Sequence, residues 1–176
     1  MIPEIDTQLA AVIKALSDNV LPAVDAGNPM AAEQIQLCLA TLGLVKTHLP
    51  ELHRYLRRDL KTHLSLARQI KQLADKTGVR ASSAAPAIAD SEKTLVDPEM
   101  GATEIEAQAR RLKEAIVDLM TAARGSAIER EIAALVIETE EIVLLRSRAW
   151  SIGMGFEPDP AQVPPLGTLL SKEQQP

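Results

Sequence analysis

The chain has few of the residues on which many binding and redox sites depend. Only 2% of its 176 residues are aromatic, namely Tyr55, Trp150 and Phe156, so a platform for stacking nucleic-acid bases is not expected. Cys38 is the only cysteine, which excludes an internal disulfide and a CxxC motif. No apolar run approaches the roughly 18 residues of a membrane span, and no signal-peptide pattern is visible. We therefore expect a cytoplasmic protein that binds neither nucleic acid nor membrane.

Familiar catalytic and nucleotide-binding motifs are absent as well. The sequence contains no GxxxxGK[ST] and no HExxH, and the GxG formed by Gly153 and Gly155 opens no strand–helix unit. The hydrolase signature GxSxG is also missing. We therefore predict no metal site and no cofactor.

What the chain does contain favours helices. It is 46% hydrophobic and 24% charged, and its apolar residues are mostly Ala, Leu, Ile and Val. Asn28 is a candidate N-cap, Pro50 separates two helical patterns, and Gly78 and Gly125 are candidate stops. Helical periodicity covers residues 3–21, 29–49, 50–77, 102–124 and 126–152. The sequence therefore predicts an all-α antiparallel bundle of about five helices.

Two segments lack such periodicity. Residues 78–101 are rich in Ala, Ser and Pro and predict a long loop, with a short helix over 90–96 as the alternative. Residues 156–176 are rich in proline and predict an extended or disordered tail, although Leu166, Leu169 and Leu170 could dock on the bundle. The predicted domains are a helical bundle over 1–155 and a tail over 156–176.

Two of the predicted helices are apolar on more than one side. Leu37 and Leu44 lie opposite the main apolar stripe of 29–49, and Ile137 and Leu144 lie away from that of 126–152. Such a helix is either central or faces a second partner. Exposed second faces on two helices indicate self-association, most simply a homodimer.

The three histidines fall in one short segment but in different places on the helical wheel. His53 and His63 differ by about 80° and by roughly 15 Å along the axis, and His48 precedes Pro50, so they cannot share one metal ion. His63 lies on the apolar side, one turn after Asp59, which could accept its N–H. The pair is either a structural feature of the core or an acid–base pair of an enzyme.

Charge is distributed unevenly. Residues 51–76 carry seven Lys/Arg and three acidic residues, a net charge of +4, so the remainder carries −9. Arg54, Arg57, Arg58 and Lys61 are candidate contacts for a phosphate, an acyl-CoA or an acidic protein; a solvated helix face is the alternative. Arg146 lies on an apolar face, where it requires a partner such as Asp59 or a nearby glutamate, unless it extends to solvent.

One resemblance to a known family concerns the first half of the chain. The first predicted helix ends in VLPA, Val20–Ala23, and an amphipathic helix and a charged helix follow. This order resembles a family of small bacterial all-helical proteins of unknown function, encoded near phosphotransferase-like and acyl-CoA dehydrogenase genes. The chain departs from that family at Met30–Glu33, where the family has an aromatic-His-x-Arg motif. The resemblance implies an accessory protein and supplies no catalytic residues.

Three functions are compatible with these observations. The first is a non-enzymatic accessory or protein-interaction bundle that self-associates. The second is a binding module for an anionic small molecule such as an acyl-CoA, held by Arg54, Arg57, Arg58 and Lys61. The third is an enzyme that works through His63 and Asp59.

Overall fold

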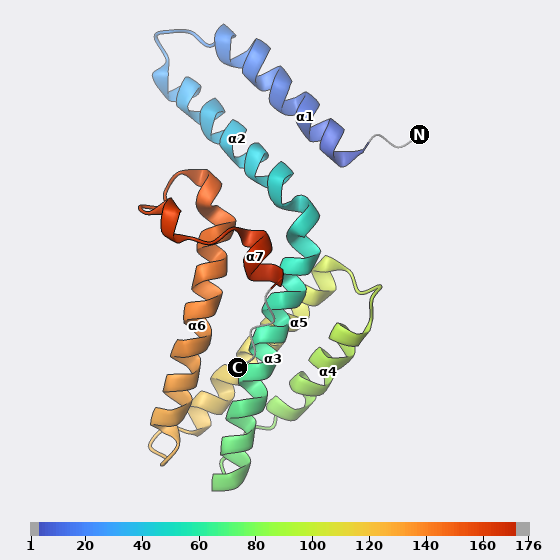
Figure 1. Ribbon diagram of the computed structural model, residues 1–176, viewed down its shortest axis with the longest axis vertical. Coiled ribbons are helices and arrows are strands. Elements are labelled where there is room, and N and C mark those ends of the chain that lie inside the picture. The colour runs from blue at the N-terminus through green and yellow to red at the C-terminus, as the bar shows by residue number, and fades with distance from the viewer. Residues whose placement is uncertain (1–3, 172–176) are drawn as a thin grey trace. The chain divides into compact units, whose positions relative to one another are not determined.

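The computed structural model describes residues 4–171, and every regular element in that range is helical (Figure 1). This confirms the all-α prediction. The sequence predicted about five helices, whereas the described range holds six of at least 11 residues and a short seventh. They are α1 (Ile5–Ala15), α2 (Pro29–His48), α3 (Leu52–Thr77), α4 (Ala84–Val96), α5 (Ala102–Ala122), α6 (Glu129–Ser151) and α7 (Leu166–Ser171).

The described residues group into two compact units. One contains the chain up to Glu51 together with Arg148–Val163, and the other contains Leu52–Ser147 together with the chain from Pro164 onward. The predicted division into a bundle over 1–155 and a tail over 156–176 stays a prediction. None of the helices in the described range has the length and apolar character needed to cross a membrane.

The first unit is built on an antiparallel pair, α1 and α2. Lys46 near the end of α2 lies 3.4 Å from Asp6 near the start of α1. The side chain of Asn28 accepts a hydrogen bond from the Ala31 N–H at 3.1 Å, which confirms it as the N-cap of α2. Within residues 4–51 only His48 is buried, so the pair has almost no core of its own.

The segment 148–163 completes this unit. The ring of Trp150 stacks on that of His48, with 4.6 Å between the ring centroids. Arg148 and Glu157 form a two-pronged ion pair, with N–O distances of 3.0 and 2.7 Å. These contacts fold the segment back on itself and bring its aromatic ring against the end of α2.

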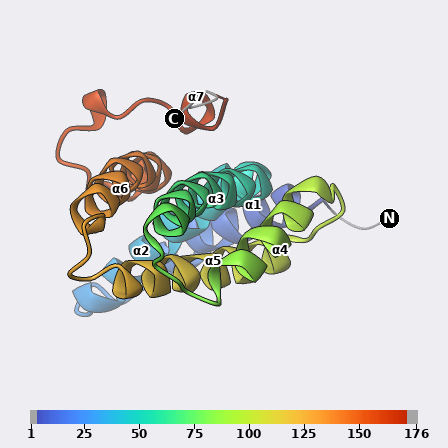
Figure 2. The same ribbon diagram turned by 90° about the horizontal axis from the view of Figure 1, so that it is seen from below.

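The second unit has a continuous core around α3. Figure 2 shows α3 between α6 on one side and α4 on the other, with α5 beneath it. The side chains buried to 2% exposure or less include Leu60, Ile70, Ile105, Leu112 and Ile132. Gly78 ends α3 in a left-handed conformation (φ 76°), as the sequence predicted.

The predicted long loop over 78–101 is wrong, because α4 occupies most of it. The alternative of a short helix over 90–96 was correct in kind but missed the first six residues of the 13-residue helix. The buried side of α4 includes Ser91 and Thr94, whose hydroxyls donate to the carbonyls of Ala87 and Asp90 at 2.7 and 2.9 Å. Because polar residues occupy part of the buried face, the hydrophobic periodicity that marks a helix is weak.

The predicted extended tail is not confirmed over the residues that the structure describes. Pro160–Gln162 forms a short 3₁₀ turn, and α7 follows. Leu166, Leu169 and Leu170 are buried, so these leucines dock as the sequence analysis considered. The rest of the predicted tail, residues 172–176, lies outside the described range.

Candidate functional site

A groove of about 900 Å³ lies between α3, α4 and α7 in the second unit. The four cations singled out in the sequence, Arg54, Arg57, Arg58 and Lys61, all line it. The remaining lining residues are His53, Leu64, Arg68, Glu92, Leu95, Val96, Pro98, Leu170 and Ser171. We refer to this feature as the basic groove.

Arg57 connects α3, which forms one wall of the basic groove, to the end of α4. Its guanidinium donates to the carbonyl of Leu95 and, at 3.0 Å, to that of Asp97. The last carbonyls of a helix have no partner within the helix, and the helix dipole favours a cation there. Arg57 therefore holds the C-terminal end of α4 against α3.

Arg54 and Arg58 hold α7 in the same way. Arg58 donates to the carbonyl of Leu170 at 2.8 Å, and Arg54 donates to the Ser171 hydroxyl at 2.8 Å. The acceptors of Arg57 and Arg58 are backbone carbonyls, which carry no net charge, so these bonds fix the two side chains without neutralising them. The cations are thereby preorganised along one wall of the groove.

The groove carries an excess of positive charge. Arg68 is paired with Glu92, the only acidic lining residue among those described, at 2.7 and 3.1 Å. Lys61 has no ion pair or hydrogen bond within residues 4–171. The opposite wall is apolar and includes Val96, which is 82% exposed. The basic groove therefore offers fixed cations on one side and uncovered apolar surface on the other.

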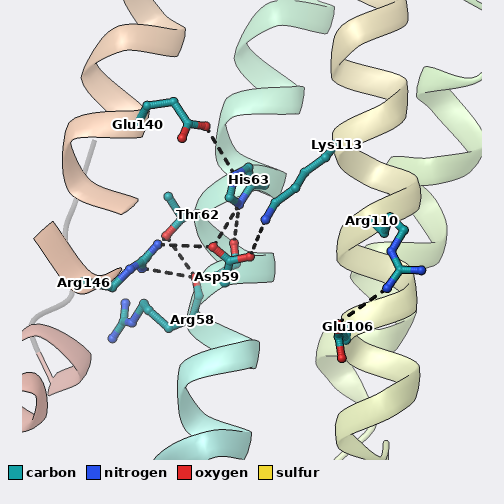
Figure 3. A network of polar contacts seen from close by, with 9 residues as sticks. All are labelled: Arg58, Asp59, Thr62, His63, Glu106, Arg110, Lys113, Glu140 and Arg146. Atoms are coloured by element: carbon teal, nitrogen blue, oxygen red, sulfur yellow. Dashed lines mark hydrogen bonds and ion pairs between the residues drawn. The ribbon is translucent and has the colours of Figure 1, made fainter. Parts of the chain in front are cut away.

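A partly buried charge network lies on another side of α3 (Figure 3). Asp59 is at its centre, with Lys113 2.9 Å from one carboxylate oxygen. The other oxygen lies 3.4 Å from Nδ1 of His63 and 3.8 Å from Nη2 of Arg146. One carboxylate from α3 thus faces basic groups from α3, α5 and α6.

Arg146 is buried, being 2% exposed, and so it does not extend to solvent. Its Nη1 donates to the Thr62 hydroxyl at 2.8 Å and approaches the Arg58 carbonyl at 3.5 Å. Its Nη2 has no hydrogen-bond partner among the described residues. Burial lowers the pKa of the Arg146 guanidinium, while the charge of Asp59 opposes that shift. Of the partners considered for Arg146 in the sequence analysis, Asp59 is therefore the one that the structure places beside it.

His63 is 3% exposed. Its Nδ1 lies 2.9 Å from the backbone carbonyl of Asp59, and because a carbonyl oxygen can only accept, Nδ1 donates. Its Nε2 faces a carboxylate oxygen of Glu140 at 3.6 Å. A cavity of about 340 Å³ adjoins His63, Lys113 and Glu140, and its described lining has no hydroxyl or thiol. An enzyme working through His63 and Asp59 stays a prediction, and a nucleophile from the lining of this cavity would have to be an amine, a carboxylate or an imidazole.

The three histidines occupy three separate environments. His48 stacks on Trp150, His53 lies 3.1 Å from the carbonyl of Met100, and His63 belongs to the charge network. Across residues 4–171, no group of three or more His, Cys, Asp or Glu side chains could hold a metal ion.

Sequence reasoning found one wall of the basic groove and missed the others. The cations of α3 follow from helical spacing. The segments of α4 and α7 carry no comparable periodic signal. They were therefore interpreted as a loop and a tail, and the residues that they contribute to the groove were missed.

No protein family, curated protein or solved structure matches this chain. Its resemblance to a family of small bacterial helical proteins stays a prediction.

Proposed function

We propose that the protein is a non-enzymatic binding module that holds a phosphate-bearing small molecule in the basic groove, for example an acyl-CoA. The observation that carries the proposal is the joint position of Arg54, Arg57, Arg58 and Lys61 along one groove wall with an excess of positive charge. The phosphates contact this wall. The organic part of the ligand lies against the apolar wall formed by the end of α4.

The spacing of the cations suits more than one phosphate group. Arg54 and Lys61 are seven residues apart, which is about 10 Å along a helix. A diphosphate lying along α3 can contact both guanidinium and ammonium groups over that length. Arginine binds phosphate oxygens through two parallel N–H bonds, and lysine adds a compact charge.

The fixed positions of the arginines also favour binding. Arg57 and Arg58 are held by carbonyls at the ends of α4 and α7. A ligand therefore does not have to order these long side chains, whose immobilisation opposes binding by about 0.5–1.5 kcal/mol each. Lys61 makes no such contact within residues 4–171 and is the cation that can be changed with least effect on the fold.

Calorimetric titration with CoA, ADP and inorganic phosphate tests the proposal. We expect CoA and ADP to bind, and their affinity to fall as salt is raised, because added ions screen the cations. Lys61→Glu should weaken binding of both nucleotides at least tenfold. Lys76→Glu is the matched control, since it reverses a charge on the exposed last turn of the same helix, outside the groove.

Two results would contradict the proposal. The first is the absence of any salt-sensitive binding of phosphate-bearing compounds by the folded protein. The second is an equal loss of affinity in Lys61→Glu and Lys76→Glu, which would show a general effect of net charge and no specific role for the groove.

A further inference from the structure

The exposed side of α2 is unusual for a helix that faces solvent. Between Gln34 and Val45 the sequence has no charged residue. Met30, Leu37 and Val45 are 67%, 44% and 43% exposed. They recur at steps of seven and eight residues, so they lie on one face of the helix. A surface helix normally carries charged residues on its outer face.

The neighbouring helix leaves apolar surface uncovered as well. Ile5 and Val12 on α1 are 61% and 48% exposed, and Val20 in the turn that follows is 43% exposed. His48 is the only buried residue between residues 4 and 51. The α1–α2 pair thus has apolar faces but too little packing to bury them, which marks an interaction surface.

We propose that this surface binds a second copy of the chain, so that two α1–α2 pairs form a four-helix bundle about a twofold axis. In such an interface the same patch meets itself, and a charge near the axis would face an identical charge. The stretch from Gln34 to Val45 has no charge to repel its copy. A different protein that binds through complementary charge would have no charged residue to pair with in this stretch.

The size of the surface agrees with a dimer. The 20 residues of α2 span about 30 Å, and the first helix with its following turn spans about 24 Å. With a width of about 10 Å per helix, one pair presents about 500 Å². Two copies together bury about 1,000 Å², which is the size that a biological protein–protein interface is expected to reach and lies just below the range of about 1,200–2,000 Å² typical of stable complexes.

Sedimentation equilibrium of the full chain at micromolar concentration tests the inference. We expect a dimer, and we expect Leu37→Glu combined with Val45→Glu to weaken it at least a hundredfold while far-UV circular dichroism stays unchanged. The matched control is Ile137→Glu combined with Leu144→Glu on α6, two residues that are 62% and 59% exposed. It should remain dimeric.

A second measurement uses conservative changes. In a Cys38→Ser background, Thr41→Cys places the only thiol between Leu37 and Val45 on the same face. A thiol-reactive crosslinker should then give covalent dimers, whereas Thr121→Cys on α5 in the same background should give none. A monomeric full chain, a dimer that only the α6 variant dissociates, or crosslinking through Thr121→Cys alone would each overturn the proposal.

Discussion

The contribution of Asp59 to stability depends on the basic groups that surround its carboxylate. Its carboxylate lies within 4 Å of Lys113, His63 and Arg146, and its side chain is only 14% exposed. A buried ion pair stabilises a fold only weakly against an apolar replacement. Removal of Asp59 costs more, because the charge of Arg146, which is 2% exposed, then stays buried without its carboxylate partner.

We expect Asp59→Asn to lower the free energy of unfolding by about 3 kcal/mol, because the buried Arg146 would lose the only carboxylate paired with it within residues 4–171. Urea denaturation followed by circular dichroism measures the change. Asp90→Asn is the control, since Asp90 pairs with Lys93 at an exposed position, and its loss should change stability by no more than about 1 kcal/mol. Equal losses in the two variants would contradict this account of the network.

Arg146→Met should have a much smaller effect, within about 1 kcal/mol of the unchanged protein. The guanidinium is desolvated, and its Nη2 makes no hydrogen bond among the described residues. Methionine is unbranched and can fill the same space, while Asp59 keeps Lys113 as its partner. The same denaturation experiment is decisive, because a loss larger than that of Asp59→Asn would mean that the arginine itself stabilises the core.

Helix boundaries could be predicted where particular residues mark them. Asn28 starts α2 and Gly78 follows the end of α3, because capping and left-handed turns depend on local chemistry that the sequence displays. The full extent of α4 could not be recognised, since its buried face contains Ser91 and Thr94. Within residues 4–171, these hydroxyls donate to carbonyls of the helix itself, and that of Ser91 also accepts from Gln108 of α5 at 3.0 Å.

The same distinction explains how much of the site the sequence revealed. The cations of α3 share a face through helical spacing alone. That they form a groove depends on Leu95 and Leu170 arriving from distant parts of the chain, and such tertiary contacts have no signature in a single sequence.

Arg57→Ala should loosen the end of α4. The variant removes the donor to the carbonyls of Leu95 and Asp97. A hydrogen bond from a charged group contributes about 1.5–3 kcal/mol, so amide exchange in the last turn of α4 should accelerate at least tenfold. Hydrogen-exchange mass spectrometry measures this. Arg124→Ala, an exposed change after α5, should leave that turn unaffected, and equal acceleration in both variants would show that Arg57 does not hold the helix.

At the scale of the whole molecule, the two units differ in the interactions that stabilise them. The second unit has a large apolar core, whereas the first relies on a few polar and ring contacts. In the first unit, the hydrogen-bonded partner Arg148 lowers the pKa of Glu157 below its ordinary value of 4.5. A carboxylate with a lowered pKa stabilises the fold fully when the pH is above the ordinary pKa of the group. This contribution is lost as the pH falls through the lowered pKa.

Acidification should therefore disturb the first unit while most helices persist. Trp150 lies two residues from Arg148 and is the only tryptophan, so its fluorescence reports on this segment. We expect its emission to change as the pH falls below about 4.5, before far-UV circular dichroism shows loss of helix. In Glu157→Gln this step should be absent. A step that persists unchanged in the variant would assign it to another group.

The glycines that follow α3 and α5 have a consequence for chemical synthesis. Gly78 and Gly125 have φ values of 76° and 71°, and a Cβ built on either one meets nothing within 4 Å. An L-residue there is opposed only by its backbone preference. D-alanine has the mirror-image preference and would restrict the unfolded chain, so where its methyl group also meets open space each replacement should stabilise the protein by about 0.4–1 kcal/mol. L-residues are therefore disfavoured at these two positions by their backbone handedness and not by a lack of space.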